Sequence, residues 1–109
     1  MGEVRRKCST VFVSADTVAA DAEVVVFEEF AGGLLIAPTG AAAQTISWYV
    51  TYAPGGEYVP CYDSTGTQAQ TVIGAAARGY EIPPAVAGAY AIKLVAGTSD
   101  ASLILCLKG

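Results

Sequence analysis

The chain has 109 residues, of which 53% are hydrophobic and 15% charged, and its formal net charge is -4 at pH 7. This length suits one domain with one core, and the acidic balance argues against a nucleic-acid-binding protein, which needs a basic face to neutralise phosphates. Because few residues are charged, Ala, Gly, Thr, Ser and Tyr must cover much of the surface, which favours an oligomer or a larger assembly.

Residues 1–8 form a predicted N-terminal arm ahead of a single domain, residues 9–109. The arm carries the basic residues Arg5, Arg6 and Lys7. One interpretation is a solvated tail, and the other is an arm that binds an acidic partner by salt-sensitive charge complementarity. The start lacks the apolar stretch and cleavage site of a secretory signal, and no apolar run reaches the roughly 18 residues of a membrane helix. We therefore expect synthesis in the cytoplasm and no membrane contact.

Eight short runs rich in β-branched and aromatic residues follow, separated by turn residues at the spacing typical of a sandwich or barrel. They are residues 9–14, 23–30, 34–38, 45–52, 57–63, 70–74, 89–96 and 102–108. The Ala-rich piece "IGAAARGYEIPP" has room for a helical turn, but its glycines and prolines oppose a stable helix. The pattern predicts an all-β fold, an antiparallel β-sandwich of the jelly-roll type with about eight strands.

The segment "FEEFAGG", residues 27–33, is typical of a β-hairpin corner in which Gly32 and Gly33 supply positive φ. A tip of this kind places Phe30 where it can contact a partner. Glu28 and Glu29 are the only adjacent carboxylates. Neighbours on a strand point to opposite faces, so this pair cannot act together as a glycosidase requires.

The next two runs gather Trp48, Tyr49, Tyr52, Tyr58 and Tyr62 around the turn signal "APGG". If residues 53–56 form the loop, the strands pair so that one side is core and the other is a Tyr/Ser/Thr surface, which predicts a contact face. The core side then holds Ile46, Trp48, Val50, Val59 and Cys61, and the contact face holds Tyr49, Tyr58, Tyr62, Ser47, Thr51 and Pro60.

A loop one residue shorter is the alternative, because a slip of one residue reverses every side chain. It would gather Trp48, Tyr52, Tyr58 and Tyr62 on one side. The first register separates apolar from polar residues better, and we prefer it.

Two Asp-containing segments read as turns rather than as metal sites. "DSTG", residues 63–66, has Asp first and Gly fourth, as a type I turn prefers. "GTSD", residues 97–100, reads as the loop of a last hairpin that pairs Leu94 with Leu103, Ile92 with Leu105 and Tyr90 with Leu107. Asp100 would accept hydrogen bonds from backbone donors there.

The sequence contains no histidine. Ser-His and Cys-His catalysis and the usual zinc sets are therefore ruled out, and we expect no enzyme, no cofactor and no metal. Cys8, Cys61 and Cys106 are an odd number without close spacing, which favours buried free thiols over a disulfide framework.

Three stretches then follow in an order that resembles a known class of protein. They are "ISWYVTYAPGGEYVPCYDSTGTQAQTV", "GYEIPPAVAGAYAIKLVAG" and the closing "LILCLKG". This order resembles the small β-sandwich decoration or cement proteins of tailed-bacteriophage capsids. The resemblance carries no active-site signature and transfers no functional residue. It implies a homotrimer on the capsid surface of the virion that bridges subunits of the major capsid protein.

The competing hypothesis is a carbohydrate-binding module of a phage tail or fibre adhesin. In it the tyrosines, or Trp48 in the alternative register, stack on sugar rings. The chain has few Asn, Asp and Arg residues, which usually bind sugar hydroxyls, and this scarcity weighs against the hypothesis.

Overall fold

The computed structural model describes residues 8–28, 30–74 and 77–109. These residues form nine strands and two short 3-10 helices. The strands are β1 (Cys8–Ala15), β2 (Val25–Val26), β3 (Gly32–Ala37), β4 (Gln44–Thr51), β5 (Val59–Pro60), β6 (Gln70–Ile73), β7 (Arg78–Glu81), β8 (Ala91–Ala96) and β9 (Ala101–Lys108). The helices are η1 (Ala19–Asp21) and η2 (Pro84–Gly88).

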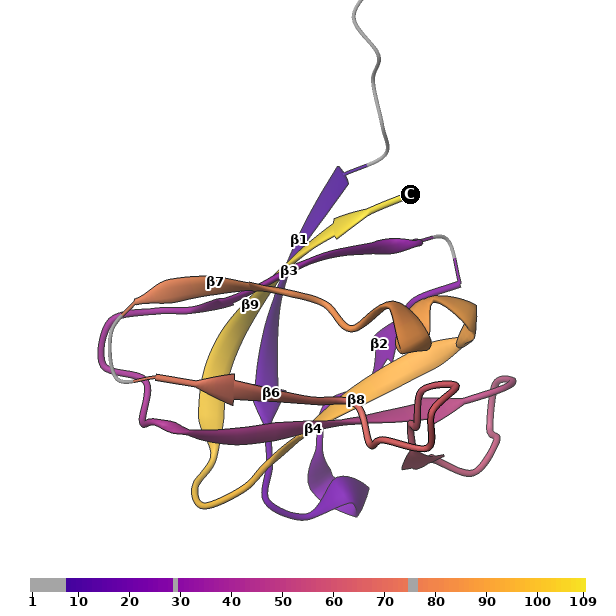
Figure 1. The fold of residues 1–109 in the computed structure, drawn as a ribbon, viewed down its shortest axis with the longest axis horizontal. Coiled ribbons are helices and arrows are strands. Elements are labelled where there is room, and N and C mark those ends of the chain that lie inside the picture. Colours follow the sequence, from indigo (N-terminus) through magenta and orange to yellow (C-terminus); the bar gives the residue numbers. More distant parts are fainter. Residues whose placement is uncertain (1–7, 29, 75–76) are drawn as a thin grey trace, which may run out of the picture.

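The strands form two antiparallel sheets packed as a sandwich (Figure 1). Sheet A has the order β1-β9-β3-β7, and sheet B has the order β2-β8-β4, with β5 and β6 both on the far side of β4. β5 pairs with Tyr49–Val50 and β6 with the earlier half of β4, so the two are pieces of one interrupted edge strand. Consecutive strands otherwise alternate between the sheets, which is the jelly-roll connectivity. The predicted fold class is confirmed.

The core lies between the sheets and follows from the alternation of each strand. β9 sends Leu103, Leu105 and Leu107 inward, and all three are buried. β4 sends Ile46 and Trp48 inward from the other sheet, and both side chains are fully buried. These residues join one apolar cluster that holds the two layers together.

The predicted last hairpin is wrong, because β8 lies in sheet B and β9 in sheet A. Ile92 pairs with Val25 and Val50, whereas Leu105 pairs with Val11 and Leu35. Ile92 and Leu105 are both fully buried in the same core cluster. The "GTSD" loop therefore crosses between the layers.

The crossing loop is fixed by a side chain from the start of β4. The Gln44 Oε1 atom accepts hydrogen bonds from the backbone N–H of Thr98 at 2.9 Å and of Ser99 at 3.1 Å. Asp100 accepts a backbone N–H as expected, but the donor is Thr17, 3.3 Å away in the segment after β1.

The segment 27–33 is likewise not a hairpin corner, since β2 belongs to sheet B and β3 to sheet A. Gly33 does adopt a positive φ of 147°, whereas Gly32 is not among the positive-φ glycines. A Cβ atom on Gly33 would collide with the carbonyl oxygen of Cys106 on the neighbouring strand. β7 was not predicted, and it lies within the Ala-rich piece that was considered only for a helical turn.

The preferred register of the aromatic hairpin is confirmed, because Val50 pairs with Val59. Two side chains depart from the predicted faces, since Val59 is exposed and Thr51 is buried. The Cys61 N–H also donates to the Trp48 carbonyl oxygen at 2.9 Å. The alternative register is wrong, since Trp48 is fully buried.

Candidate interaction surfaces

The outer face of sheet A carries apolar side chains where alternation would ordinarily place polar ones. We call Phe12, Leu34, Ile36, Ile104 and Cys106 the apolar sheet face. Phe12 lies beside Ile104, and Ile104 beside Ile36, in one row across three strands. Phe12 is 74% exposed and Leu34 is 43% exposed. No described residue covers Phe12 to any large extent.

Charged residues stand at the margins of this face rather than within it. Glu81 pairs with Leu34 on the edge strand β7, and Lys108 lies at the end of β9. A hollow of about 350 Å³ opens beside Phe12 and is lined in part by Ile104, Pro38 and the charged Glu23. Contiguous apolar surface of this kind is typical of an interaction site.

Sequence reasoning missed this face, although a signal was present. In "SLILCLK" the residues Ile104 and Cys106 occupy the outward positions between the buried leucines. In "STVFVS" Phe12 stands at an outward position between Val11 and Val13. An apolar residue at an outward position indicates a covered or contacting face.

The predicted contact face on β4 and β5 has a different character. Tyr49 and Tyr58 are half-buried, and Tyr49 lies beside the buried Lys93 of β8. The Lys93 amine lies 4.5 Å from the centroid of the Tyr58 ring and donates to the Ala19 carbonyl oxygen of η1 at 3.0 Å. Burial raises the pKa of Tyr58, with a further contribution from Tyr90. These contacts attach η1 to the outside of sheet B.

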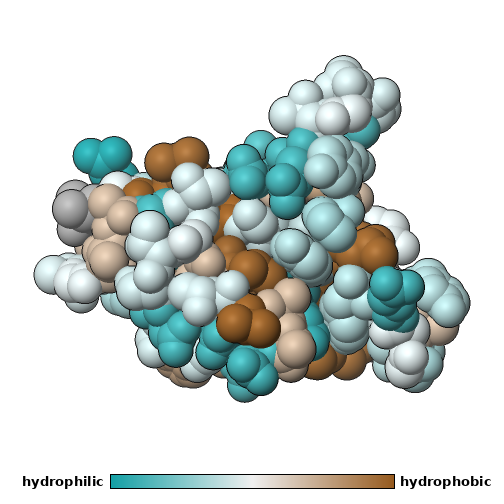
Figure 2. All heavy atoms as spheres, turned by 90° about the horizontal axis from the view of Figure 1, so that it is seen from below, coloured by the Kyte–Doolittle hydropathy of each residue, from teal (hydrophilic) through white to brown (hydrophobic). Residues whose placement is uncertain are grey.

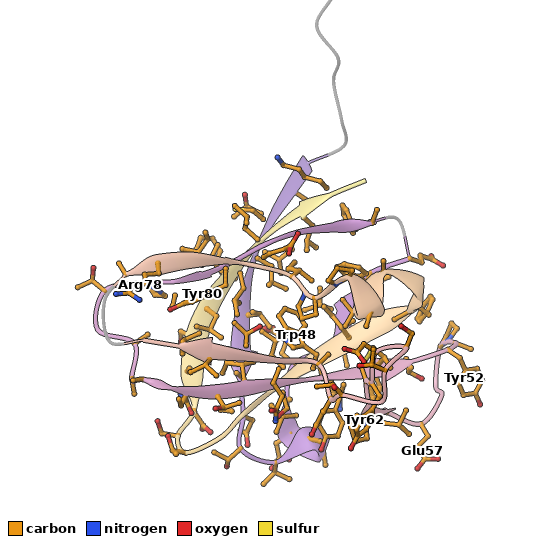
Figure 3. The ribbon with its side chains drawn as sticks, viewed as in Figure 1. Trp48, Tyr52, Glu57, Tyr62, Arg78 and Tyr80 are labelled. Carbon is orange, nitrogen blue, oxygen red and sulfur yellow. The ribbon has the colours of Figure 1, made fainter. Side chains whose placement is uncertain are left out.

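Tyr62 is the exposed member of the predicted tyrosine set, at 56%. It lines an open groove of about 740 Å³ together with Asp63, Gln68, Gln70, Pro83 and Pro84. Figure 3 shows Tyr62 near the end of the sandwich that also carries Tyr52 and Glu57, away from Arg78 and Tyr80.

The Asp63 carboxylate organises the loop at this groove. It accepts hydrogen bonds from the Thr65 hydroxyl at 2.6 Å, the Thr65 N–H at 2.9 Å and the Thr67 N–H at 3.0 Å. The Thr65 hydroxyl first, and then the backbone donors, lower the pKa of Asp63. The Gly66 N–H donates to the Asp63 carbonyl oxygen at 3.0 Å, which confirms the predicted turn. Across the described ranges, no His, Cys, Asp and Glu side chains cluster as a metal site would need.

A second hollow, of about 310 Å³, lies between the β4–β5 hairpin and η2. It is lined by Val50, Tyr52, Glu57, Val59 and, from the η2 side, Ala85 and Gly88. Tyr52 is 81% exposed, and sequence reasoning did not single it out in the preferred register.

Figure 2 shows the underside of the molecule, where brown apolar patches are scattered among white and teal surface.

The remaining predicted site residues are placed as follows. Phe30 is half-buried against the core, with its ring centroid 6.1 Å from that of Phe27. Arg5, Arg6 and Lys7 lie outside the described residues. Cys61 is a buried free thiol whose pKa is raised by burial and then by Asp63, and Cys106 is a half-buried free thiol.

No protein-family model matches the chain, and no curated protein matches it in sequence. The structure is similar to the crystal structure of SPBc2 prophage-derived protein YomS, with a TM-score of 0.61 and 15% sequence identity. The match covers 100% of this chain and 99% of YomS. At this identity the likeness shows a shared β-sandwich fold over the whole length of both chains. No helix in the described part of the chain is long and apolar enough to cross a membrane.

Proposed function

We propose that this protein is a structural protein of a phage virion that decorates the outer surface of the head. It binds the major capsid protein and stabilises the shell by bridging neighbouring subunits. The observation that carries the proposal is the likeness to a prophage-derived protein over 100% and 99% of the two chains. The order of motifs in the sequence supports the same class of protein.

The apolar sheet face supports a mechanism of attachment. Removing apolar side chains from water is favourable. A partner that covers this face would therefore be stabilised by burying Phe12, Leu34 and Ile104. A stable contact of standard size buries roughly 1,200–2,000 Å². Many copies bound across subunit boundaries resist rupture because several contacts must break together.

The test uses the purified full chain and expanded heads of the phage that encodes it, stripped of this protein. We expect saturable cosedimentation and heads that rupture at a higher temperature. The variant Leu34→Ser/Ile104→Ser should bind at least about tenfold more weakly, since an apolar side chain contributes about 1.5–3 kcal/mol when buried. Val72→Ser is the matched control, because Val72 is 70% exposed on β6 of the other sheet.

Two results would contradict the proposal. One is the absence of any binding to heads at high protein concentration. The other, for the attachment face, is a double variant that remains folded and binds as tightly as the wild type.

Carbohydrate binding is the second candidate, and the groove at Tyr62 favours it. An exposed aromatic ring beside Asp63, Gln68 and Gln70 offers a stacking surface with hydrogen-bonding groups nearby. A glycan-array signal that disappears in Tyr62→Ala, from a protein that ignores heads, would favour this function over decoration. Buried Trp48 cannot contribute to such a site.

A further inference from the structure

Strand β1 is an edge strand of sheet A, with β9 on one side and no strand on the other among the described residues. It is eight residues long, "CSTVFVSA", and contains no charged residue, proline or glycine. Natural proteins usually protect edge strands with charges, prolines or short length, because the open backbone groups can pair with another chain. No residue of β1 itself provides such protection, and Glu23 covers the edge only at Ser14.

The other sheet edges are protected by these means. β7, at the opposite edge of sheet A, has four residues and carries Arg78 and Glu81 at its ends. In sheet B, β2 and β5 have two residues each, and the edge formed by β5 and β6 is interrupted. β1 is therefore the long, uncharged edge among the strands described.

The hydrogen bonds of Ser14 show which backbone N–H and C=O groups of β1 point away from β9. The Ser14 N–H donates to the Glu23 carboxylate at 3.0 Å and its carbonyl oxygen accepts from the Glu23 N–H at 3.5 Å, both on the side away from β9. Since backbone direction alternates along a strand, the N–H and C=O groups of Phe12, Thr10 and Cys8 point to this same side. Within the described residues, Thr10 and Phe12 meet no hydrogen-bond partner there.

We propose that two copies of this chain associate by antiparallel pairing of β1 with β1 about a two-fold axis at Thr10. Thr10 of one copy pairs with Thr10 of the second, and Phe12 pairs with Cys8, so that all three residues exchange backbone hydrogen bonds. Glu23 already occupies Ser14, and among the described residues this is the register that pairs Cys8, Thr10 and Phe12 without using Ser14.

A second copy suits this edge better than an unrelated strand for two reasons. In this register Phe12 of each copy meets Cys8 of the other, so the contact is self-complementary, as an isologous contact requires. Both edges are uncharged, so the pairing brings no like charges together. The four strands of each sheet A then form one continuous sheet, and the two apolar sheet faces lie on the same side of it.

This self-association goes beyond attachment to a head and does not depend on it, so it is tested without heads. The mass of the full chain is measured by light scattering over a concentration series. Amide hydrogen exchange is measured by NMR at the lowest and highest concentrations. We expect a monomer–dimer equilibrium, with the amides of Thr10 and Phe12 exchanging at least about tenfold more slowly at high concentration. The amides of Val11 and Val13, which bond to β9, should be slow throughout.

Thr10→Pro removes the N–H group at the two-fold axis without removing a bond of the β1–β9 ladder, so it should yield a folded monomer. Thr10→Ala keeps the N–H group and should remain dimeric. If Thr10→Pro does not fold, Thr10→Lys replaces it, because the two lysines would repel each other across the axis.

The proposal is overturned by a monomer at every concentration. It is equally overturned by a folded Thr10→Pro or Thr10→Lys protein that still dimerises. A trimer, or a dimer in which the Thr10 and Phe12 amides still exchange quickly, would assign the contact to another surface.

Discussion

Trp48 and Thr71 form a polar pair inside an otherwise apolar layer. The indole N–H of Trp48 donates to the Thr71 hydroxyl at 2.9 Å, and both residues are buried. A buried donor without an acceptor destabilises the folded state by its full desolvation cost. The bond therefore fixes the orientation of the largest side chain in the core.

Thr71→Val should lower the free energy of unfolding by about 1–3 kcal/mol, because the Trp48 N–H loses its acceptor. Urea unfolding measures the change, and Trp48, the single tryptophan of the chain, provides the fluorescence signal. Val72→Thr, at the exposed neighbouring position, should stay within about 0.5 kcal/mol of the wild type. Equal stability of Thr71→Val and the wild type would show that this hydrogen bond contributes little.

Lys93 shows where residue-level prediction fails. Alternation places it on the outer face of β8, which is correct, and an outer lysine is expected to be exposed. It is buried because the η1 segment, far away in sequence, packs over it and accepts its hydrogen bond through Ala19. Local patterns do not contain that information, whereas they did predict the buried leucines of β9.

At the level of elements, most strands could be predicted from β-favouring runs, but their partners could not. The β8–β9 loop has the length of a hairpin loop, and the same length also crosses between the two layers. β7 was missed because its sequence, "RGYE", has one residue of high β-propensity. Pairing with β3 supplies what the propensity of β7 lacks.

Gly33 lies near the start of β3, where its backbone passes close to the neighbouring strand β9. Gly33→Ala should lower the free energy of unfolding by at least about 1–3 kcal/mol, since its φ of 147° is strained for other residues. The added Cβ would also collide with the Cys106 carbonyl oxygen. Thermal and urea unfolding measure the effect.

Gly32→Ala is the matched control, because a Cβ there meets no atom within 4 Å. Its free energy of unfolding should change by less than about 1 kcal/mol. If both variants had the same stability, the backbone at Gly33 would not be constrained as described.

At the scale of the whole molecule, composition predicted a contact surface and could not locate it. The uncharged, outward-facing residues form one continuous face only because the fold places β1, β9 and β3 side by side. The tyrosines that sequence reasoning favoured are divided by the fold between packing against Lys93 and exposure at a groove.

The salt dependence of head binding distinguishes the apolar sheet face from the basic arm. Binding through the apolar face should change less than about threefold between roughly 50 and 500 mM NaCl, because salt screens charges and not apolar contacts. Sedimentation of the full chain with heads measures this. The contrary result is binding that falls steeply as salt increases, together with a loss of this salt dependence when Arg5, Arg6 and Lys7 are replaced by Gln. That result would assign attachment to the arm instead.

The position of β9 has a consequence for how the chain folds. β9 is the last strand in sequence, yet it lies in the middle of sheet A, between β1 and β3. Cys8 pairs with Lys108, so this ladder closes a loop of nearly the whole domain. Such distant pairings slow folding. During synthesis β3 can pair with β7, but β1 and β3 have no strand between them until β9 has left the ribosome, so sheet A is completed only then.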